Sequence, residues 1–234
     1  MLSIPGFSDP VSSLSHLAAA VVFAGLSGFL VARGRGDARR VISLAVFAFS
    51  CVLLLSLSGV YHLLSPGTAA RGVLMRLDHA AIFVLIAGSF TPVHVILLRQ
   101  RWHGHLLAWI WAAAIAGLTL KTIYFDAVPA WLGLLLYLGL GWLGLISTVA
   151  LARSFGVSFV LPLVWGALAY TFGALADFAN WPVLVAGVVG PHEVFHLAVV
   201  AGISLHWAFI YGIASASRAD SLDPEIAVLD FRAG

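Results

Sequence analysis

The side chains with the clearest chemistry in this sequence are imidazoles at helical spacing inside apolar segments. His192 and His196 are four residues apart, and so are Ser58 and His62. Residues four apart lie on one face of a helix, about one turn from each other, so their side chains can converge on one point. His62, His192 and His196 can supply three nitrogens to a tetrahedral metal ion and leave its fourth position to water, as catalytic sites do.

Zinc is the cofactor that we expect at this site. The lone cysteine, Cys51, lies inside an apolar run. A disulfide framework and a thiolate site are therefore excluded, and any metal must be held by histidines and carboxylates. Zinc suits imidazole ligands, although iron, copper or nickel would accept the same nitrogens.

Three further residues are candidates for catalysis. Asp78 is expected at the same depth as the three histidines, where its carboxylate can accept a hydrogen bond from water at the metal or orient a ligand. Ser58, one turn inward from His62, can act in the same way. Glu193 is a second candidate for the general base.

The segment from His192 to His196 also fits the H-E-x-x-H pattern of metalloproteases, in which the glutamate is the general base. An intramembrane protease is therefore an alternative. Against it, such enzymes take a third ligand from a later segment, where this chain offers only His206 before the acidic residues of its tail. A protease would also leave His62 and Asp78 unexplained.

The other polar and small residues have simpler interpretations. His206 lies about 15 Å along the helix axis from His196, so we expect it to hydrogen bond between helices. Lys121 and Asp177 form either a charge pair or two side chains that reach toward the interface. The remaining histidines are expected at the headgroups, and the glycines are expected to allow close helix packing. These last expectations cover His16, His79, His94, His103 and His105, and, among the 23 glycines, Gly139, Gly141 and Gly144.

The elements that must position these residues are membrane helices. Of the 234 residues, 62% are apolar and only 9% are charged, whereas soluble domains are about one quarter charged. The uncharged stretches are close to or longer than the roughly 20 residues that cross a hydrocarbon core of about 30 Å. We predict an all-α protein, a single domain over residues 1–234 that forms a bundle of seven transmembrane helices. The expected helices lie near 13–32, 42–64, 78–98, 105–124, 129–152, 158–178 and 189–213.

The charged residues also indicate an orientation. Ionisable residues within the expected helices gather at the end of the bundle that carries the N-terminus, although each is costly at membrane depth. Most of the 12 Lys and Arg residues fall in the loops and tail at the opposite end. The positive-inside rule then places the N-terminus outside and the C-terminus in the cytoplasm. No basic face studded with aromatic residues indicates a nucleic-acid partner, and membrane lipids are the expected partners.

Taken together, the motifs resemble those of the hemolysin III family, the bacterial branch of the progestin and adipoQ receptor family, which is related to alkaline ceramidases. The resemblance covers nearly the whole chain and rests on Asp9 to His16, Ser58-Gly-Val-Tyr-His62, Arg76-Leu-Asp-His-Ala80, Ala87-Gly-Ser-Phe-Thr-Pro92, His192-Glu-Val-Phe-His196 and His206.

The resemblance implies a protein of the bacterial inner membrane and an intramembrane zinc ion held by His62, His192 and His196. Asp78 and Ser58 would lie near that ion. It also implies hydrolysis of a lipid amide such as ceramide. Adiponectin receptors of this family keep the N-terminus in the cytoplasm, opposite to the orientation that the arginines indicate.

The leading hypothesis is a zinc-dependent hydrolase of an amide or ester bond in a membrane lipid, similar to a ceramidase. The alternative is a non-enzymatic sensor or receptor-like protein of the membrane state, with a structural zinc whose coordination Asp78 would complete. A pore-forming hemolysin is disfavoured, because a conducting path needs polar residues along its whole length and here they gather at one end.

Overall fold

The computed structural model describes residues 8–98 and 101–216. For residues 101–103 it describes the backbone only. This part of the chain forms eight α-helices and no strand. They are α1 (Pro10–Ala32), α2 (Ala38–Leu63), α3 (Ala69–Ile96), α4 (Arg101–Ile123), α5 (Ala130–Trp142), α6 (Gly144–Phe155), α7 (Val157–Phe178) and α8 (Pro191–Ile213). Because α5 and α6 together make one span, there are seven spans long and apolar enough to cross a membrane. The predicted all-α architecture and number of spans are confirmed.

Short polar segments set the helix boundaries. Asp37 precedes α2, and its carboxylate accepts hydrogen bonds from the backbone N–H groups of Arg39 and Arg40. Thr68 caps α3 in the same way through the N–H group of Arg71. These caps satisfy backbone donors that the first turn of a helix cannot pair internally. Gly156 separates α6 from α7 with a φ of 88°, a conformation that favours glycine.

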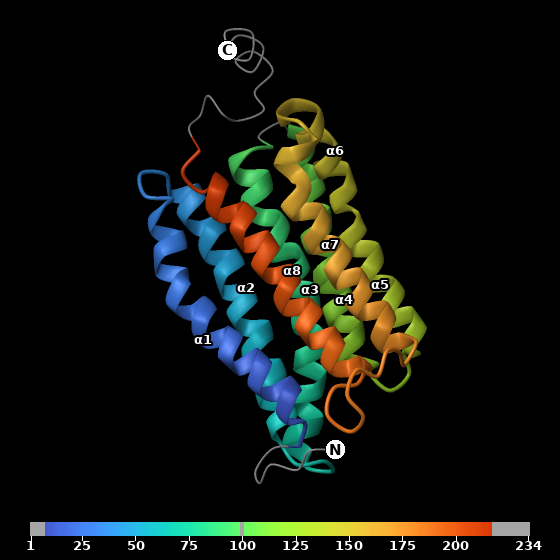
Figure 1. Ribbon diagram of the computed structural model, residues 1–234. Coiled ribbons are helices and arrows are strands. Elements are labelled where there is room, and N and C mark those ends of the chain that lie inside the picture. Colours follow the sequence, from blue (N-terminus) through green and yellow to red (C-terminus); the bar gives the residue numbers. More distant parts are fainter. Residues whose placement is uncertain (1–7, 99–100, 217–234) are drawn as a thin grey trace, which may run out of the picture.

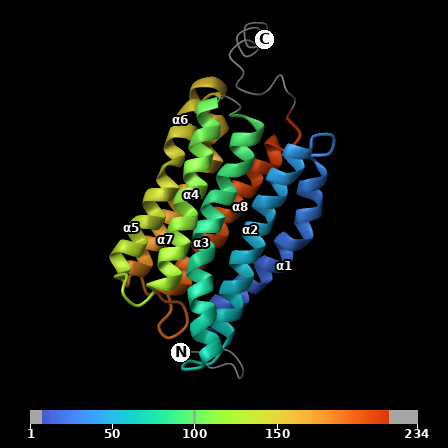
Figure 2. The same cartoon turned by 180° about the vertical axis from the view of Figure 1, so that it is seen from behind.

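The helices run side by side along the bundle, with the beginning of α1 at one end and the end of α8 at the other (Figure 1). The last helix, α8, packs against α7, α1 and α3. A buried core of α1, α2, α3 and α8 includes Phe23, Phe47, Trp207 and Ile210. On the opposite side, α4 and α5 close the bundle (Figure 2), and a smaller core that includes Phe83, Ile110 and Leu140 joins them to α3.

The third helix begins nine residues earlier than expected, at Ala69 instead of residue 78. Charged residues normally mark the end of a membrane span, but Arg71 and Arg76 in this first part of α3 are paired. Arg71 forms an ion pair with Asp9, and Arg76 forms one with Asp126. Asp78 therefore lies in the third turn of α3, inside the bundle, and does not open the helix.

Glycines do permit close helix packing, but mostly not at the positions expected. A Cβ atom on Gly173 would lie 2.7 Å from the Cβ atom of Ala198, and one on Gly117 would lie 2.4 Å from the Phe83 ring. Gly139 and Gly141 have no other atom within 4 Å of such a Cβ, whereas Gly144 approaches Phe90 at 3.3 Å. The prediction is therefore wrong for Gly139 and Gly141.

Candidate metal centre

Three imidazoles meet at the end of the bundle where α2 ends and α8 begins. His62 lies one residue before the end of α2, and His192 and His196 lie in the first two turns of α8. Each of the three offers a ring nitrogen, and these nitrogens all lie within 4.8 Å of one another. The structure thus brings together the three residues that the sequence selected, although 130 residues separate His62 from His192.

The spacing of the ring nitrogens suits a tetrahedral ion. The Nε2 atom of His192 lies 3.2 Å from Nε2 of His62 and 3.0 Å from Nε2 of His196. With metal–nitrogen bonds of about 2.0–2.1 Å, tetrahedral geometry places two ligand nitrogens about 3.3 Å apart. His62 and His196 are buried, and His192 is partly buried. The cluster could therefore hold a metal ion.

Two carboxylates hold the outer sides of two of these rings. The Nδ1 atom of His62 lies 3.0 Å from Oδ2 of Asp9, and Nδ1 of His192 lies 3.1 Å from Oδ1 of Asp177. Arg71 also donates to Oδ2 of Asp9, at 2.8 Å. Partial burial acts to raise the pKa of the Asp9 carboxyl, but the hydrogen bonds from His62 and Arg71 outweigh it and leave that pKa below its ordinary value.

His16 holds the third ring. It comes from α1, is only 2% exposed, and its ring centroid lies 4.1 Å from that of His196. Its Nε2 atom lies 3.3 Å from the backbone oxygen of His196, and its Nδ1 atom lies 3.2 Å from Nδ1 of His196. The expectation that His16 lies among the headgroups is therefore wrong, because α8 folds back onto α1 and covers it.

The carboxylate partners determine the tautomers of two of the three ligands. Ionised carboxylates only accept hydrogen bonds, so Nδ1 of both His62 and His192 must carry the hydrogen. Nδ1 of His196 lies 3.0 Å from Nε2 of His16 and 3.2 Å from its Nδ1 atom. The Nε2 atoms of His62 and His192 are left with bare lone pairs 3.2 Å apart, and Nε2 of His196 lies 3.0 Å from Nε2 of His192. Such an arrangement is repulsive without a cation and is the one that metal-binding histidines adopt with their outer hydrogen-bond partners.

Asp78 and Ser58 lie beside the cluster. Both line a cavity that His192 and His196 also line. Ser58 is 2% exposed, and its hydroxyl interacts with the Asp78 carboxylate. The other oxygen contact of Asp78 is with Nδ1 of His79 at 3.7 Å. Both residues are therefore placed to reach a molecule in the cavity, and their catalytic roles stay predictions.

Glu193 lies on a side of α8 that does not face the cavity lined by His192 and His196. One carboxylate oxygen accepts from the backbone N–H of Gly190 at 2.9 Å, and the other accepts from the Ser12 hydroxyl at 3.3 Å. The first contact caps α8 and the second ties α8 to α1. Glu193 lines a small separate pocket with Asp9 and does not line the cavity beside the three histidines.

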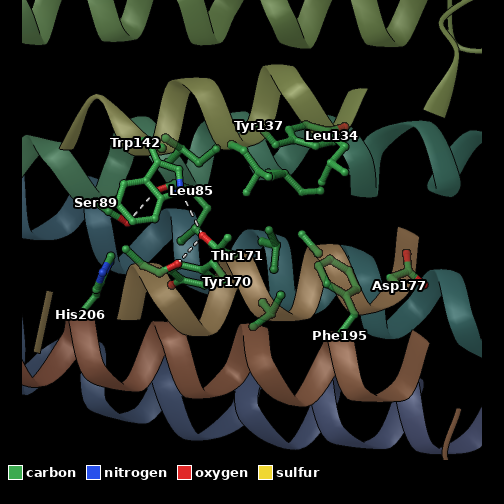
Figure 3. Close-up of a pocket in the computed structure, with 18 of the residues that line it drawn as sticks. Leu85, Ser89, Leu134, Tyr137, Trp142, Tyr170, Thr171, Asp177, Phe195 and His206 are labelled. Atoms are coloured by element: carbon green, nitrogen blue, oxygen red, sulfur yellow. Dashed lines mark hydrogen bonds between the residues drawn. The ribbon is translucent and has the colours of Figure 1, made fainter. Parts of the chain in front are cut away.

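The cavity has a volume of about 720 Å³. Asp177 lies at one end of it and His206 at the other, with Leu85, Leu134 and Phe195 between them (Figure 3). A space of this size falls within the range of ligand-binding pockets. Its walls are mainly apolar, and His192 and His196 of the cluster also line it.

The remaining polar residues are resolved as follows. His206 donates to the carbonyl oxygen of Leu163 in α7 at 3.2 Å, which confirms the expected bond between helices. His94 is only 4% exposed and lies 3.2 Å from the Ser147 hydroxyl, so its assignment to the headgroups is wrong. His79 is partly buried and His105 is exposed, while the side chain of His103 lies outside the described residues.

Sequence reasoning missed the partners Asp9, His16 and Asp177 as parts of the site. Asp9 and His16 delimit one of the stretches that carry the family resemblance, but no spacing rule connects them to α2 or α8. His16 contacts His196, which is 180 positions away, and Asp9 contacts His62, which is 53 positions away. Only the packing of α1 against α2 and α8 brings them to the ligands.

Comparisons with known proteins agree with this architecture. The model of the haemolysin-III related family matches residues 7–207. Hemolysin-3 from Bacillus cereus is 33% identical over 171 residues, which cover 73% of this chain and 74% of that protein. A hemolysin-3 homologue from Bacillus subtilis is 30% identical over 174 residues, which cover 74% of this chain and 78% of that protein. This chain, a multi-pass membrane protein, therefore belongs to the haemolysin-III related family.

Proposed function

We propose that this protein is a zinc-dependent hydrolase of an acyl bond, amide or ester, in a membrane lipid. The observation that carries this proposal is the set of three imidazoles whose ring nitrogens lie within 4.8 Å of one another beside an apolar cavity. The outer nitrogen of each ring is already held by Asp9, Asp177 or His16. Three nitrogen ligands with one open position are typical of catalytic zinc.

Zinc is favoured by the chemistry of the ligands. The described part of the site offers imidazole nitrogens with carboxylates behind them and no thiolate, because Cys51 is buried in the core of α2. When bound, zinc supplies a Lewis acid for a carbonyl group and makes water a better nucleophile near neutral pH.

Asp78 is the best-placed group to move a proton. Its carboxylate lines the cavity beside His192, and Ser58 interacts with it. In hydrolysis, a bond forms between a water oxygen and the acyl carbon while the bond to the leaving nitrogen or oxygen breaks. Asp78 would accept the proton that water loses and return it to the leaving group.

The cavity would hold the acyl chain. Leu85, Leu134 and Phe195 provide apolar walls between the two ends of the cavity (Figure 3). Burying a hydrocarbon chain there places its polar end beside Asp78 and the histidines, which orients the scissile bond without a contact to the rest of the lipid.

Metal analysis combined with a turnover assay tests the proposal. Purified wild-type protein should contain zinc and should hydrolyse ceramides or phospholipids, and His196→Ala should lose both properties. Asp78→Ala should keep the metal and lose turnover. His105→Ala, which removes an exposed imidazole outside the cluster, is the matched control and should behave as wild type. Turnover that survives both His196→Ala and Asp78→Ala would rule out this mechanism.

One observation favours a second candidate, a membrane-state sensor with a structural metal. The cluster and its partners tie α1, α2 and α8 together, so a metal here would also fasten the two ends of the chain. Metal loss that unfolds the protein, in a preparation without turnover on any acyl lipid, would favour this second function.

A further inference from the structure

Lys121 is a buried cation that the proposed chemistry does not use. It lies two residues before the end of α4, and it is only 7% exposed. It lines the same cavity as Asp78 and His192. A charged side chain inside a membrane helix is costly, and such residues usually face a partner or a ligand path.

Among the described residues, no carboxylate lies within 4 Å of the ammonium of Lys121, although Asp126 acts on it electrostatically. Its contact is with the ring of Phe125, whose centroid lies 4.6 Å from Nζ. The charge pair with Asp177, one of the two alternatives considered from the sequence, is not formed, because Asp177 accepts from His192 instead. A cation over an aromatic ring keeps the N–H donors that point away from the ring available for an anion.

The other cations at this end of the bundle are paired. Arg71 lies 2.8 Å from a carboxylate oxygen of Asp9, and Arg76 lies 2.8 Å from one of Asp126. Two carboxylates line the same cavity as Lys121, but neither forms an ion pair with it. Asp177 lies 3.1 Å from Nδ1 of His192, and Asp78 interacts with Ser58.

A glycine of α5 lies opposite Lys121. The facing residue on α5 is Gly133, and a Cβ atom added there would lie 3.7 Å from Nζ. Tyr137, one turn further along α5, also lines the cavity, and its hydroxyl donates to the backbone oxygen of His79 at 3.2 Å. The glycine places no side chain between the ammonium and α5, and the cavity that Lys121 lines has a volume of about 720 Å³.

The depth of Lys121 indicates which anion it would meet. Two residues correspond to about 3 Å of helix, so Nζ lies close to the end of a span that is about as long as the hydrocarbon core is thick. Phosphate groups of phospholipids lie at that level. The cavity thus presents two separate polar sites, His192 and His196 of the cluster, and Lys121. A phospholipid has two matching groups, an acyl carbonyl and a phosphate, whereas a free fatty acid has one.

We propose that Lys121 binds the phosphate of a phospholipid whose acyl chain occupies the cavity, which makes a phosphate-bearing lipid the preferred ligand over an uncharged one. The inference rests on the proposed function in taking the cavity as the place of the acyl chain. Binding of the phosphate itself requires neither the metal nor turnover.

A binding experiment in an uncharged maltoside detergent tests this inference. Wild-type protein would be titrated with oleoyl lysophosphatidylglycerol, with monooleoylglycerol and with glycerol phosphate, and the bound fraction would be measured by native mass spectrometry. Lys121→Met removes the positive charge but keeps a side chain of similar length, and Lys121→Arg keeps the charge. Arg153→Met, which removes an exposed cation of α6, is the matched control. Each protein would also be tested in the His196→Ala background, which cannot hydrolyse the lipid.

Wild type, Lys121→Arg and Arg153→Met should bind lysophosphatidylglycerol about 10- to 100-fold more tightly than Lys121→Met does, the range expected for one charged hydrogen bond. Monooleoylglycerol should bind all four proteins equally. The same differences should persist in the His196→Ala background, even if no turnover is found. Equal binding of lysophosphatidylglycerol by wild type and Lys121→Met would overturn the inference. So would glycerol phosphate that binds as tightly as the lysolipid, because the site would then be one for free phosphate.

Discussion

His16 and His196, which are 180 residues apart in the sequence, face each other through their Nδ1 atoms at a distance of 3.2 Å. His16 also donates from Nε2 to the backbone oxygen of His196 at 3.3 Å. The first membrane helix thus holds both the ring and the backbone of a residue in the last one. This contact directs Nε2 of His196 toward His192 and His62, and makes α1 part of the candidate metal centre.

The first prediction concerns this contact. Replacing His16 with alanine should weaken metal binding by about 10- to 100-fold, because His196 loses the buried hydrogen-bond partner that orients its ring. Competition with a chromophoric chelator would measure the change. Ser15→Ala, which alters the neighbouring position on α1 outside the cluster, is the control. Unchanged affinity in His16→Ala would show that α1 does not orient the ligand.

Removal of the metal should destabilise the protein. The ion would join α2 to α8, so a chelator should lower the thermal unfolding temperature by about 10 °C when the metal was present at 1,000 times its dissociation constant. Fluorescence-detected unfolding with and without chelator gives the shift. His196→Ala should show no response, since it has no complete site to lose. A chelator effect of the same size in that variant would assign the shift to another site.

Asp78 and Ser58 should separate catalysis from metal binding. Asp78→Asn should lower the turnover number about 10²- to 10⁴-fold, the range for loss of a general base, while metal content stays at the wild-type level. Ser58→Ala should cause a smaller loss, since Ser58 acts through Asp78. Steady-state hydrolysis and metal analysis on the same samples test both statements. Loss of the metal in Asp78→Asn would instead make Asp78 a ligand and favour the closed structural site.

The contact between α7 and α8 should tolerate no added methyl group at Gly173. A Cβ atom there would lie 2.7 Å from the Cβ atom of Ala198 and 3.3 Å from the backbone of Phe195. Gly173→Ala should therefore cost about 1–3 kcal/mol of stability, as overpacking does. Gly139→Ala has no atom within 4 Å of its new methyl group and should be neutral or slightly stabilising. Unfolding temperatures of the two variants provide the comparison.

The orientation in the membrane stays a prediction that labelling can check. In a Cys51→Ser background, a cysteine in place of Ser65, between α2 and α3, should react with an impermeant maleimide added to intact cells. A cysteine in place of Arg35, between α1 and α2, should react only after the membrane is opened, if the positive-inside rule holds. The reverse pattern would place the metal centre on the cytoplasmic side.

Much of the fold was determined by the sequence alone. Long apolar stretches have one stable solution in a bilayer, because every backbone group must be hydrogen-bonded within the helix. The number of spans and their type were therefore predictable. The start of α3 was not predictable, because the charged residues Arg71 and Arg76 interrupt the apolar run in the sequence. In the structure Asp9 and Asp126 pair with these arginines, so the helix includes both of them.

The same division applies to the site. Helical spacing selected His192 and His196, and the clustering of polar residues at one end selected His62, since helices crossing a membrane bring their ends to a common level. What decided the chemistry came from tertiary structure. Asp9 and Asp177 fix the tautomers of His62 and His192, His16 packs against His196, and Glu193 caps its own helix. These contacts depend on which helix lies beside which and on how each is rotated about its axis. Hydrophobicity determines that a helix crosses the membrane, but side-chain packing between helices determines which residues each helix face contacts.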